Sequence, residues 1–390
     1  MAEQIHIVKQ AVRAVLPWWV SFCLIVFIFG MAMQFLPNMM NLPRFYGTQW
    51  ANNLTHHDPF SNMMIAEQGY GKTGRIDLQT SVRYPAFPMA VRFTMRATGW
   101  SGPIAMFWVS KLFLFGGLVG LWLLVRHLHG EEQANRAVPY MLFPLLGSGY
   151  TWMMSFPEPV HLFTWTLGFY FILTKRYYLC GLVTVLGVWS RPQALLILPA
   201  YALILLDELR RKEYHGVFDT RLWRNGLFVG VIPFIAHSAW ILHISKITQL
   251  PFSPITAQAP YGRSEFQLPW ERVWEHIQWV WETRDLIYRP ETVFEVYQFI
   301  LIALALCGMV YLVMRRQLPL GILVFSALCV GLGLSTAIFA SGRYALLTWI
   351  PVVAIYFIPK KYDQVIIPIG VSFSFLLVVL LSMTEWRFTA

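Results

Sequence analysis

The sequence predicts an all-α polytopic membrane protein: a single integral-membrane domain over residues 1–390 with about eleven transmembrane helices. Of these residues 57% are hydrophobic and only 13% are charged, about half the charged fraction of soluble domains. Apolar runs of about 17–24 residues, long enough to cross a bilayer as helices, recur from end to end. The runs are continuously apolar rather than alternating, which excludes strands as the spanning elements, because lipid admits only helices and closed barrels.

The first predicted span, 14–36, is expected to remain in the protein as an uncleaved helix. Its apolar run from Val15 to Leu36 is too long for a signal peptide, and further spans follow it. The apolar runs between residues 159 and 206 are short, so ten or twelve spans are also compatible with the sequence. The remaining apolar runs predict spans near 103–126, 136–154, 159–174, 177–190, 192–206, 226–245, 296–314, 319–340, 343–358 and 364–383.

The formal net charge of +10 is explained by membrane topology rather than by nucleic-acid binding. When alternate loops are assigned to alternate sides, the short loops on one side contain only Arg191, Arg343 and the tail residue Arg387. By the positive-inside rule, the opposite, basic side and the N-terminus are cytoplasmic. The residues assigned to the cytoplasmic side are Lys9, Arg13, Arg126, Arg136, Lys175, Arg176, Arg210, Arg211, Lys212, Arg221, Arg224, Arg315, Arg316, Lys360 and Lys361.

The two long connections, 37–102 and 246–295, both fall on the predicted extracytoplasmic face. Function in such a scaffold tends to reside on long loops that rigid helices hold in place. In the first loop, the apolar spacing predicts a short helix over 60–68 that ends at Gly69. A second short helix is expected after Pro85 or Pro88, and both are expected to lie along the membrane surface.

The second loop is predicted to contain an amphipathic helix rich in tryptophan. Its apolar residues recur at the helical period and charged residues cover the other face. Trp at the level of the lipid headgroups is the expected interfacial anchor, although direct stacking of a sugar on these rings is the alternative. The apolar residues are Trp270, Val273, Trp274, Ile277, Val280 and Trp281.

Asp58 is the first candidate for chemistry. It lies in the first long loop, just after the first span, where a carboxylate is badly placed for packing and well placed to act at the membrane surface. The alternative is structural: Asp58 followed by Pro59 suits the N-cap and first position of a helix, and both roles are compatible. His56 and His57 precede it, so a divalent metal stays open, although adjacent His residues do not share a helix face.

Three further residues are candidates because they are charged and lie in very short outer turns. Glu158, near His161, is costly at that depth unless it is paired or functional; ordinary helix-end polarity is the alternative. Arg191 and Arg343 lie on the outside, so the positive-inside rule does not explain them. Arg suits bidentate contact with phosphate, and snorkelling to ordinary headgroups is the alternative.

Together these features favour a sugar linked to a polyprenyl phosphate as the substrate. The lipid tail would lie between helices, the phosphate would meet Arg, and the sugar would face the carboxylate. The sequence has no P-loop, and its GxGxxG run, Gly69 to Gly74, follows a predicted helix rather than a strand. A dinucleotide-binding turn would follow a strand, so this run agrees with an enzyme that needs no soluble nucleotide-sugar domain.

The chain resembles the GT-C membrane glycosyltransferases, and in particular the PIG-V-like mannosyltransferases, which include GPI mannosyltransferase II and bacterial relatives. The family has Trp-Asp, six residues, Ile-Ala-x-x-Gly-Tyr, and then an aromatic-Pro-x-x-Pro segment. Here His57 stands where the family has Trp. The segments that fit are Asp58, Ile65-Ala66 and Gly69-Tyr70; Tyr84 to Pro88; the Glu158 turn within Ser155 to Phe163; Ser190 to Leu195 with Leu198-Pro199-Ala200; and Arg343-Tyr344.

The resemblance implies an inverting transfer of a hexose, with mannose the expected one, from a polyprenyl-phosphate donor to a hydroxyl of a lipid or glycan acceptor. Asp58 would be the catalytic base, and a general base contributes roughly 10²–10⁴-fold. Cations paired with the leaving phosphate would stabilise the negative charge that develops there, in addition to the action of the base. The implied substrate-binding residues are His57, Tyr70, Glu158, Arg191, Arg343 and Tyr344.

Two other classes of function stay open. A transporter or flippase for a lipid-linked or anionic substrate would explain the spans and the outer Arg residues. It would not explain two long structured loops on one face, and transporters usually keep their binding groups near the midplane. The third class is a catalytically silent scaffold subunit of a membrane complex.

The expected location is the plasma membrane of a prokaryote, with the active site facing outward. Asn53-Leu54-Thr55 is a glycosylation sequon on the predicted outer loop. A glycan five residues from Asp58 would obstruct the site, which favours a prokaryotic source or an unused sequon.

Overall fold

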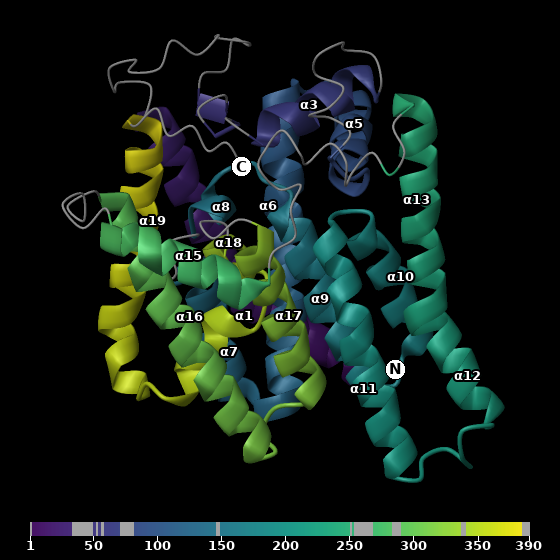
Figure 1. Ribbon diagram of the computed structural model, residues 1–390. Helices are drawn as coiled ribbons and strands as arrows, with labels where there is room; N and C mark the ends of the chain where they lie inside the picture. Colours follow the sequence, from purple (N-terminus) through teal and green to yellow (C-terminus); the bar gives the residue numbers. More distant parts are fainter. Residues whose placement is uncertain are drawn as a thin grey trace.

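The computed structural model describes residues 2–32, 50–51, 54–55, 58–70, 82–145, 149–249, 252, 268–282, 290–336 and 341–383. Every regular element within these ranges is a helix (Figure 1). The helices are α1 (Ala2–Ala32), α3 (Asp58–Gln68), α5 (Ala86–Thr98), α6 (Gly102–His129), α7 (Glu131–Leu142), α8 (Tyr150–Met153), α9 (Glu158–Leu173), α10 (Tyr177–Val188), η4 (Pro192–Leu196), α11 (Ile197–Arg210), α12 (Thr220–Gly226), η5 (Leu227–Val231), α13 (Ile232–Thr248), α15 (Pro269–Glu282), α16 (Pro290–Met314), α17 (Leu320–Thr336), α18 (Ser341–Leu346), η9 (Ile350–Tyr356), η10 (Lys360–Tyr362) and α19 (Asp363–Met383).

The prediction of an all-α membrane protein is confirmed. Five helical segments in the described ranges are long and apolar enough to cross a bilayer, and two apolar helices, Tyr177–Val188 and Leu320–Ser335, are shorter. The total of about eleven spans stays a prediction. The five segments are Glu3–Ala32, Gly102–His129, Pro192–Arg210, Thr220–Thr248 and Val296–Met314.

The first helix begins well before the apolar run that predicted it. α1 starts at Ala2 rather than near residue 14, because residues 2–13 contain neither Gly nor Pro to end a helix. Ala11 and Val15 are fully buried and belong to the main apolar core. Hydropathy marks only the apolar part of such a helix and misses its polar first turns.

Two predicted spans are broken in the structure. The run 136–154 ends as a helix at Leu142, and α8 resumes only at Tyr150. Phe143, with φ −125° and ψ 62°, precedes Pro144, and the residue before proline is disfavoured in the helical region. The run 343–358 forms α18 and then the 3-10 helix η9, which has Pro351 in its first turn.

The centre of the bundle is built on close packing of α6 against α9, which lie side by side in Figure 1. Glycines make this approach possible. A Cβ on Gly117 would lie 2.8 Å from Leu162, and one on Gly120 would lie 2.5 Å from Thr166. Small residues at such contacts let helix backbones approach within van der Waals distance, which is how apolar helices associate in lipid.

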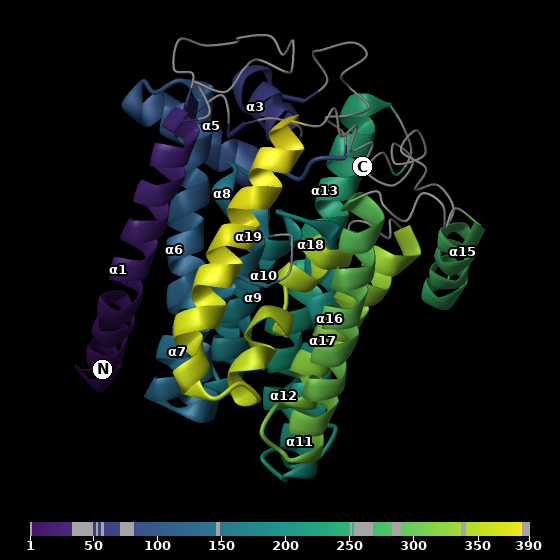
Figure 2. The same ribbon diagram turned by 90° about the vertical axis from the view of Figure 1, so that its left-hand side faces the viewer.

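Both predicted helices of the first long loop are present, and they lie together at one end of the bundle (Figures 1 and 2). We call this the α3 end, and the opposite end, which holds α12, the α12 end. α3 ends at Gln68 before Gly69, whose φ is +87°, and α5 follows Pro85. Met63 and Val91 pack in one apolar cluster with Met106 of α6.

The predicted tryptophan-rich helix is also present, as α15. Its Trp270, Trp274 and Trp281 are 65%, 60% and 70% exposed, so most of the surface of these rings lies outside the bundle. α15 lies to one side of the bundle in Figure 2. An interfacial position on the bilayer stays the prediction for this helix.

Candidate functional site

Glu158 is the first residue of α9 and is fully buried. Pro157 and Pro159 flank it, which suits a helix start, where the missing amide hydrogen of proline leaves no intrahelical bond unmade. The helix dipole also favours a carboxylate in the first turn. Helix-end polarity therefore accounts for the position of Glu158 in the chain but not for its partners.

Oε1 of Glu158 accepts hydrogen bonds from two guanidinium groups. Nη2 of Arg191 lies 2.5 Å away, and Nε of Arg343 also donates to this oxygen. Arg191 is the extended residue before η4, and Arg343 is the third residue of α18. The guanidinium of Arg343 also covers the Phe156 ring, 4.6 Å from its centroid. The structure thus joins three sequence-predicted residues in what we call the Glu158 cluster.

The three residues of the Glu158 cluster carry two positive charges and one negative charge. Two guanidinium groups and one carboxylate give these three residues a formal sum of +1, and the Arg side chains are only 13% and 15% exposed. Like charges repel strongly in surroundings of low permittivity, so Glu158 holds together two cations that would otherwise separate. Its second oxygen, Oε2, is buried with no hydrogen-bond partner.

The backbone ties the Glu158 cluster to the predicted functional loop. The amide of Ser155, three residues before Glu158, donates to the carbonyl of Leu54 at 2.9 Å. The amide of Ala86, at the start of α5, donates to the carbonyl of Trp189 at 2.8 Å, two residues before Arg191. One bond thus joins Ser155 to Leu54, four positions before α3, and the other joins the start of α5 to the segment before Arg191.

Asp58 is the first residue of α3, four positions after Leu54. Its side chain and the residues His56 and His57 lie outside what the structure describes. The catalytic role of Asp58, the contact of His57 with substrate and the metal alternative therefore stay predictions. In the part of the chain that is described, no group of three or more His, Cys, Asp or Glu residues is placed to hold a metal.

Two predicted substrate contacts have other partners in the structure. The hydroxyl of Tyr70 donates to the carbonyl of Arg83 at 3.2 Å, and its ring lies 5.0 Å from the ring of Trp240. Tyr344 is buried and packs against Leu332. These contacts tie the two tyrosines to their neighbours in the fold; a role in binding substrate stays a prediction.

Lys111 is a residue that the sequence reasoning missed. It is fully buried in α6, and its ammonium donates to the carbonyls of Trp152, Met153 and Met154, the last two at 3.1 Å each. These carbonyls end α8 and lead directly into the turn that carries Glu158. A lone charge inside an apolar run is itself a signal of function or pairing, and applying that rule to 103–126 would have identified Lys111.

No protein-family model matches the chain, and no curated protein matches its sequence.

Proposed function

We propose that this chain is an integral-membrane, inverting glycosyltransferase that moves a hexose, with mannose the expected one, from a polyprenyl-phosphate donor to an acceptor hydroxyl. The observation that carries the proposal is the Glu158 cluster: a buried carboxylate that brings together two guanidinium groups 152 positions apart in sequence, at 191 and 343. The family resemblance of the sequence segments that meet around it supports the same conclusion.

The two guanidinium groups are the proposed site for the donor phosphate. Arg presents several N–H donors in a planar fork that matches phosphate oxygens. Glu158 would orient both forks and limit their mutual repulsion. The surrounding apolar helices provide the place for the polyprenyl tail, since the described bundle exposes many large apolar side chains, among them Leu242 and Leu304.

Asp58 is the proposed general base. The acceptor O–H would give its proton to the Asp58 carboxylate while the acceptor oxygen bonds to the anomeric carbon of the sugar. The bond from that carbon to the phosphate oxygen would break, and polyprenyl phosphate would leave with the electron pair toward Arg191 and Arg343. Attack opposite the leaving group inverts the anomeric configuration, and this reaction would take place at the extracytoplasmic face.

The test is transfer of radiolabelled mannose from polyprenyl-phosphate mannose to membrane acceptors, using purified protein in proteoliposomes. Asp58→Asn is expected to lower transfer by about 10²–10⁴-fold, the usual contribution of a general base, while donor binding persists. Asp207→Asn is the control, because Asp207 pairs with Arg211 on the exposed surface at the far end of α11.

Undiminished transfer by Asp58→Asn, at matched amounts of folded protein, would remove Asp58 from the reaction. If the wild type transfers no sugar but moves the labelled lipid between leaflets, the transporter or flippase alternative would replace the enzyme.

A further inference from the structure

A row of buried polar groups without hydrogen-bond partners begins at Glu158 and continues along one face of α9. Residues spaced by three and four share a helix face, so Glu158, His161 and Trp165 lie one below another. Oε2 of Glu158, both ring nitrogens of His161 and Nε1 of Trp165 have no partner. His161 and Trp165 are each 1% exposed. The row therefore lies inside the bundle, away from the surface.

The row continues through aromatic contacts toward the α12 end. The Trp165 ring lies 6.5 Å from the ring of Trp349, and Trp349 lies 6.4 Å from His129. His129 in turn lies 4.7 Å from Tyr356. Nε1 of Trp349, Nε2 of His129 and the hydroxyl of Tyr356 are again buried without partners.

The polar atoms of the row need hydrogen-bond partners that the described side chains do not supply. Buried polar groups in native proteins nearly always find partners, and buried waters typically supply such bonds where protein groups do not. Seven unpartnered atoms in one row are difficult to reconcile with a dry interior.

We propose that these groups line a file of internal water that enters the bundle between His129 and Tyr356 and ends at Glu158. His129 and Tyr356 are only partly buried, whereas Trp349, Trp165, His161 and Glu158 are almost completely enclosed. Water and protons then reach the second oxygen of Glu158 from the α12 end, opposite to α3 and α5. The inference does not depend on the proposed glycosyltransferase activity.

Four fully buried tryptophans provide a matched comparison. Trp122 and Trp152 are as buried as Trp165 and Trp349, but their indole N–H groups have partners. Nε1 of Trp122 donates to Oδ1 of Asn135 at 2.8 Å, and Nε1 of Trp152 donates to the carbonyl of Met141 at 2.8 Å. The protein itself accepts the indole hydrogen bonds of Trp122 and Trp152 but not those of Trp165 and Trp349. Only Trp165 and Trp349 should therefore contact water.

The experiment is NMR on full-length protein with ¹⁵N-labelled indoles in lipid nanodiscs, with signals assigned by single Trp→Phe substitutions. Trp165 and Trp349 are expected to show cross-peaks to water and hydrogen–deuterium exchange at least about tenfold faster than Trp122 and Trp152, a factor comparable to that of one hydrogen bond. Equal behaviour of all four indoles, whether fast or slow, would overturn the proposal.

The direction of entry has its own test. His129→Phe removes the polar group at the proposed mouth and should slow exchange of the Trp349 indole by about tenfold, again the worth of one hydrogen bond. His127→Phe is the control, because His127 lies on the same helix and contacts Tyr170 instead of the row. An unchanged Trp349 exchange rate in His129→Phe, in a folded variant whose Trp122 and Trp152 stay protected, would overturn entry at this end.

Discussion

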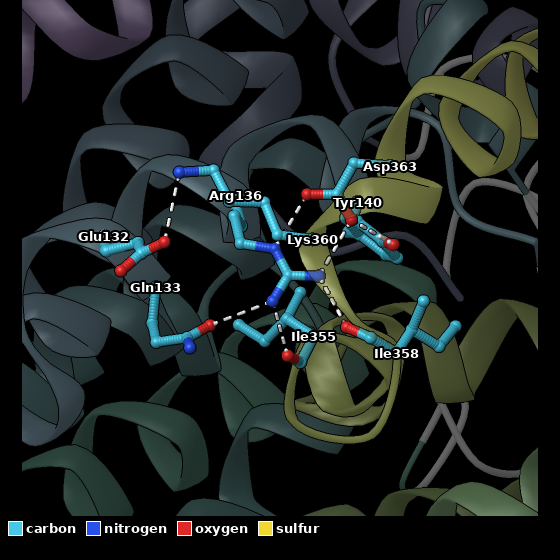
Figure 3. A network of polar contacts seen from close by, with 8 residues as sticks. All are labelled: Glu132, Gln133, Arg136, Tyr140, Ile355, Ile358, Lys360 and Asp363. Atoms are coloured by element: carbon cyan, nitrogen blue, oxygen red, sulfur yellow. Dashed lines mark hydrogen bonds and ion pairs between the residues drawn. The ribbon is translucent and has the colours of Figure 1, made fainter.

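Two buried clusters of arginine and carboxylate lie in the part of the molecule that the structure describes, and they are built differently. In the first, Arg136 of α7 binds Asp363 through Nε at 2.7 Å and Nη2 at 2.8 Å, and its remaining donors reach the carbonyls of Ile355 and Ile358 at 2.8 Å (Figure 3). Tyr140 donates to the same carboxylate at 2.9 Å. One cation meets one anion, and both oxygens of the carboxylate are bonded.

The Glu158 cluster differs in charge and in hydrogen bonding. Two cations share one carboxylate oxygen, and the other oxygen has no partner. A cluster that only ties helices together is most stable when it is neutral and fully bonded, as the Arg136 cluster is. The shared oxygen and the unbonded second oxygen distinguish the Glu158 cluster from the Arg136 cluster.

The largest effect on stability is expected at the Arg136 cluster. Arg136→Met leaves the Asp363 carboxylate with Tyr140 but without its cation, and it removes the Arg136 hydrogen bonds to the carbonyls of Ile355 and Ile358. Removing one partner of a buried ion pair typically destabilises by about 3–5 kcal/mol. The measurement is the free energy of unfolding in detergent micelles. Binding of the polyprenyl-phosphate sugar per folded molecule should not change. A variant as stable as the wild type would contradict the assignment of this cluster to fold stability.

Arg343→Gln should weaken donor binding more than it weakens the fold. A hydrogen bond to a charged group contributes about 1.5–3 kcal/mol, so affinity for polyprenyl phosphate is expected to fall about 10–100-fold. Binding to vesicles that contain the lipid phosphate measures this directly. Arg224→Gln, in α12 at the other end of the bundle, is the matched control. Equal loss of affinity in both variants would mean that the overall positive charge of the protein holds the phosphate, and not Arg343 in particular.

Lys111→Met is expected to affect both stability and activity, because Lys111 fixes the backbone before Glu158. Leaving its carbonyl acceptors buried without a donor should destabilise by about 1–3 kcal/mol. Sugar transfer per folded molecule should fall as well, since the turn that carries Glu158 loses its support. If transfer stays at the wild-type level in the folded variant, Lys111 does not position the site.

The smallest expected effect is a loss of stability at low pH, caused by protonation of Asp363 in the Arg136 cluster. Burial alone would raise the pKa of Asp363, but hydrogen bonds from Arg136 and Tyr140 outweigh it and hold the pKa below its usual value. A lowered pKa contributes stability above the pKa of the unfolded chain and loses it as the pH falls through the folded pKa. The wild type should therefore unfold more easily below about pH 4, and Asp363→Asn should show less of this dependence.

Much of the fold follows from local sequence patterns, and the failures have identifiable causes. Apolar runs predicted the spanning helices, and the two short loop helices followed from apolar spacing together with Gly69 and Pro85. Hydropathy cannot detect where an apolar run stops being helical, so the breaks after Leu142 and after Leu346 were missed. Pro144 was the available signal for the first break.

The sequence identified the residues of the Glu158 cluster but not the hydrogen bonds that join them. Glu158, Arg191 and Arg343 were identified because each is a charge in a short turn between apolar runs. Their meeting at one carboxylate oxygen depends on how α9, η4 and α18 pack, which no local pattern encodes. Arg136 is assigned to the cytoplasmic side by its charge, and that assignment stays a prediction. Its burial, with a side chain only 8% exposed and bonded to Asp363, is not encoded in the charge pattern.

The most direct test of the central claim compares the two acidic residues Asp58 and Asp363 in one sugar-transfer assay, at equal amounts of folded protein. Asp58→Asn is predicted to lose transfer by about 10²–10⁴-fold while it keeps wild-type stability and donor binding. Asp363→Asn is predicted to lose stability but to keep its transfer rate per folded molecule. Wild-type transfer by Asp58→Asn, or equal loss of transfer in both variants, would contradict the account.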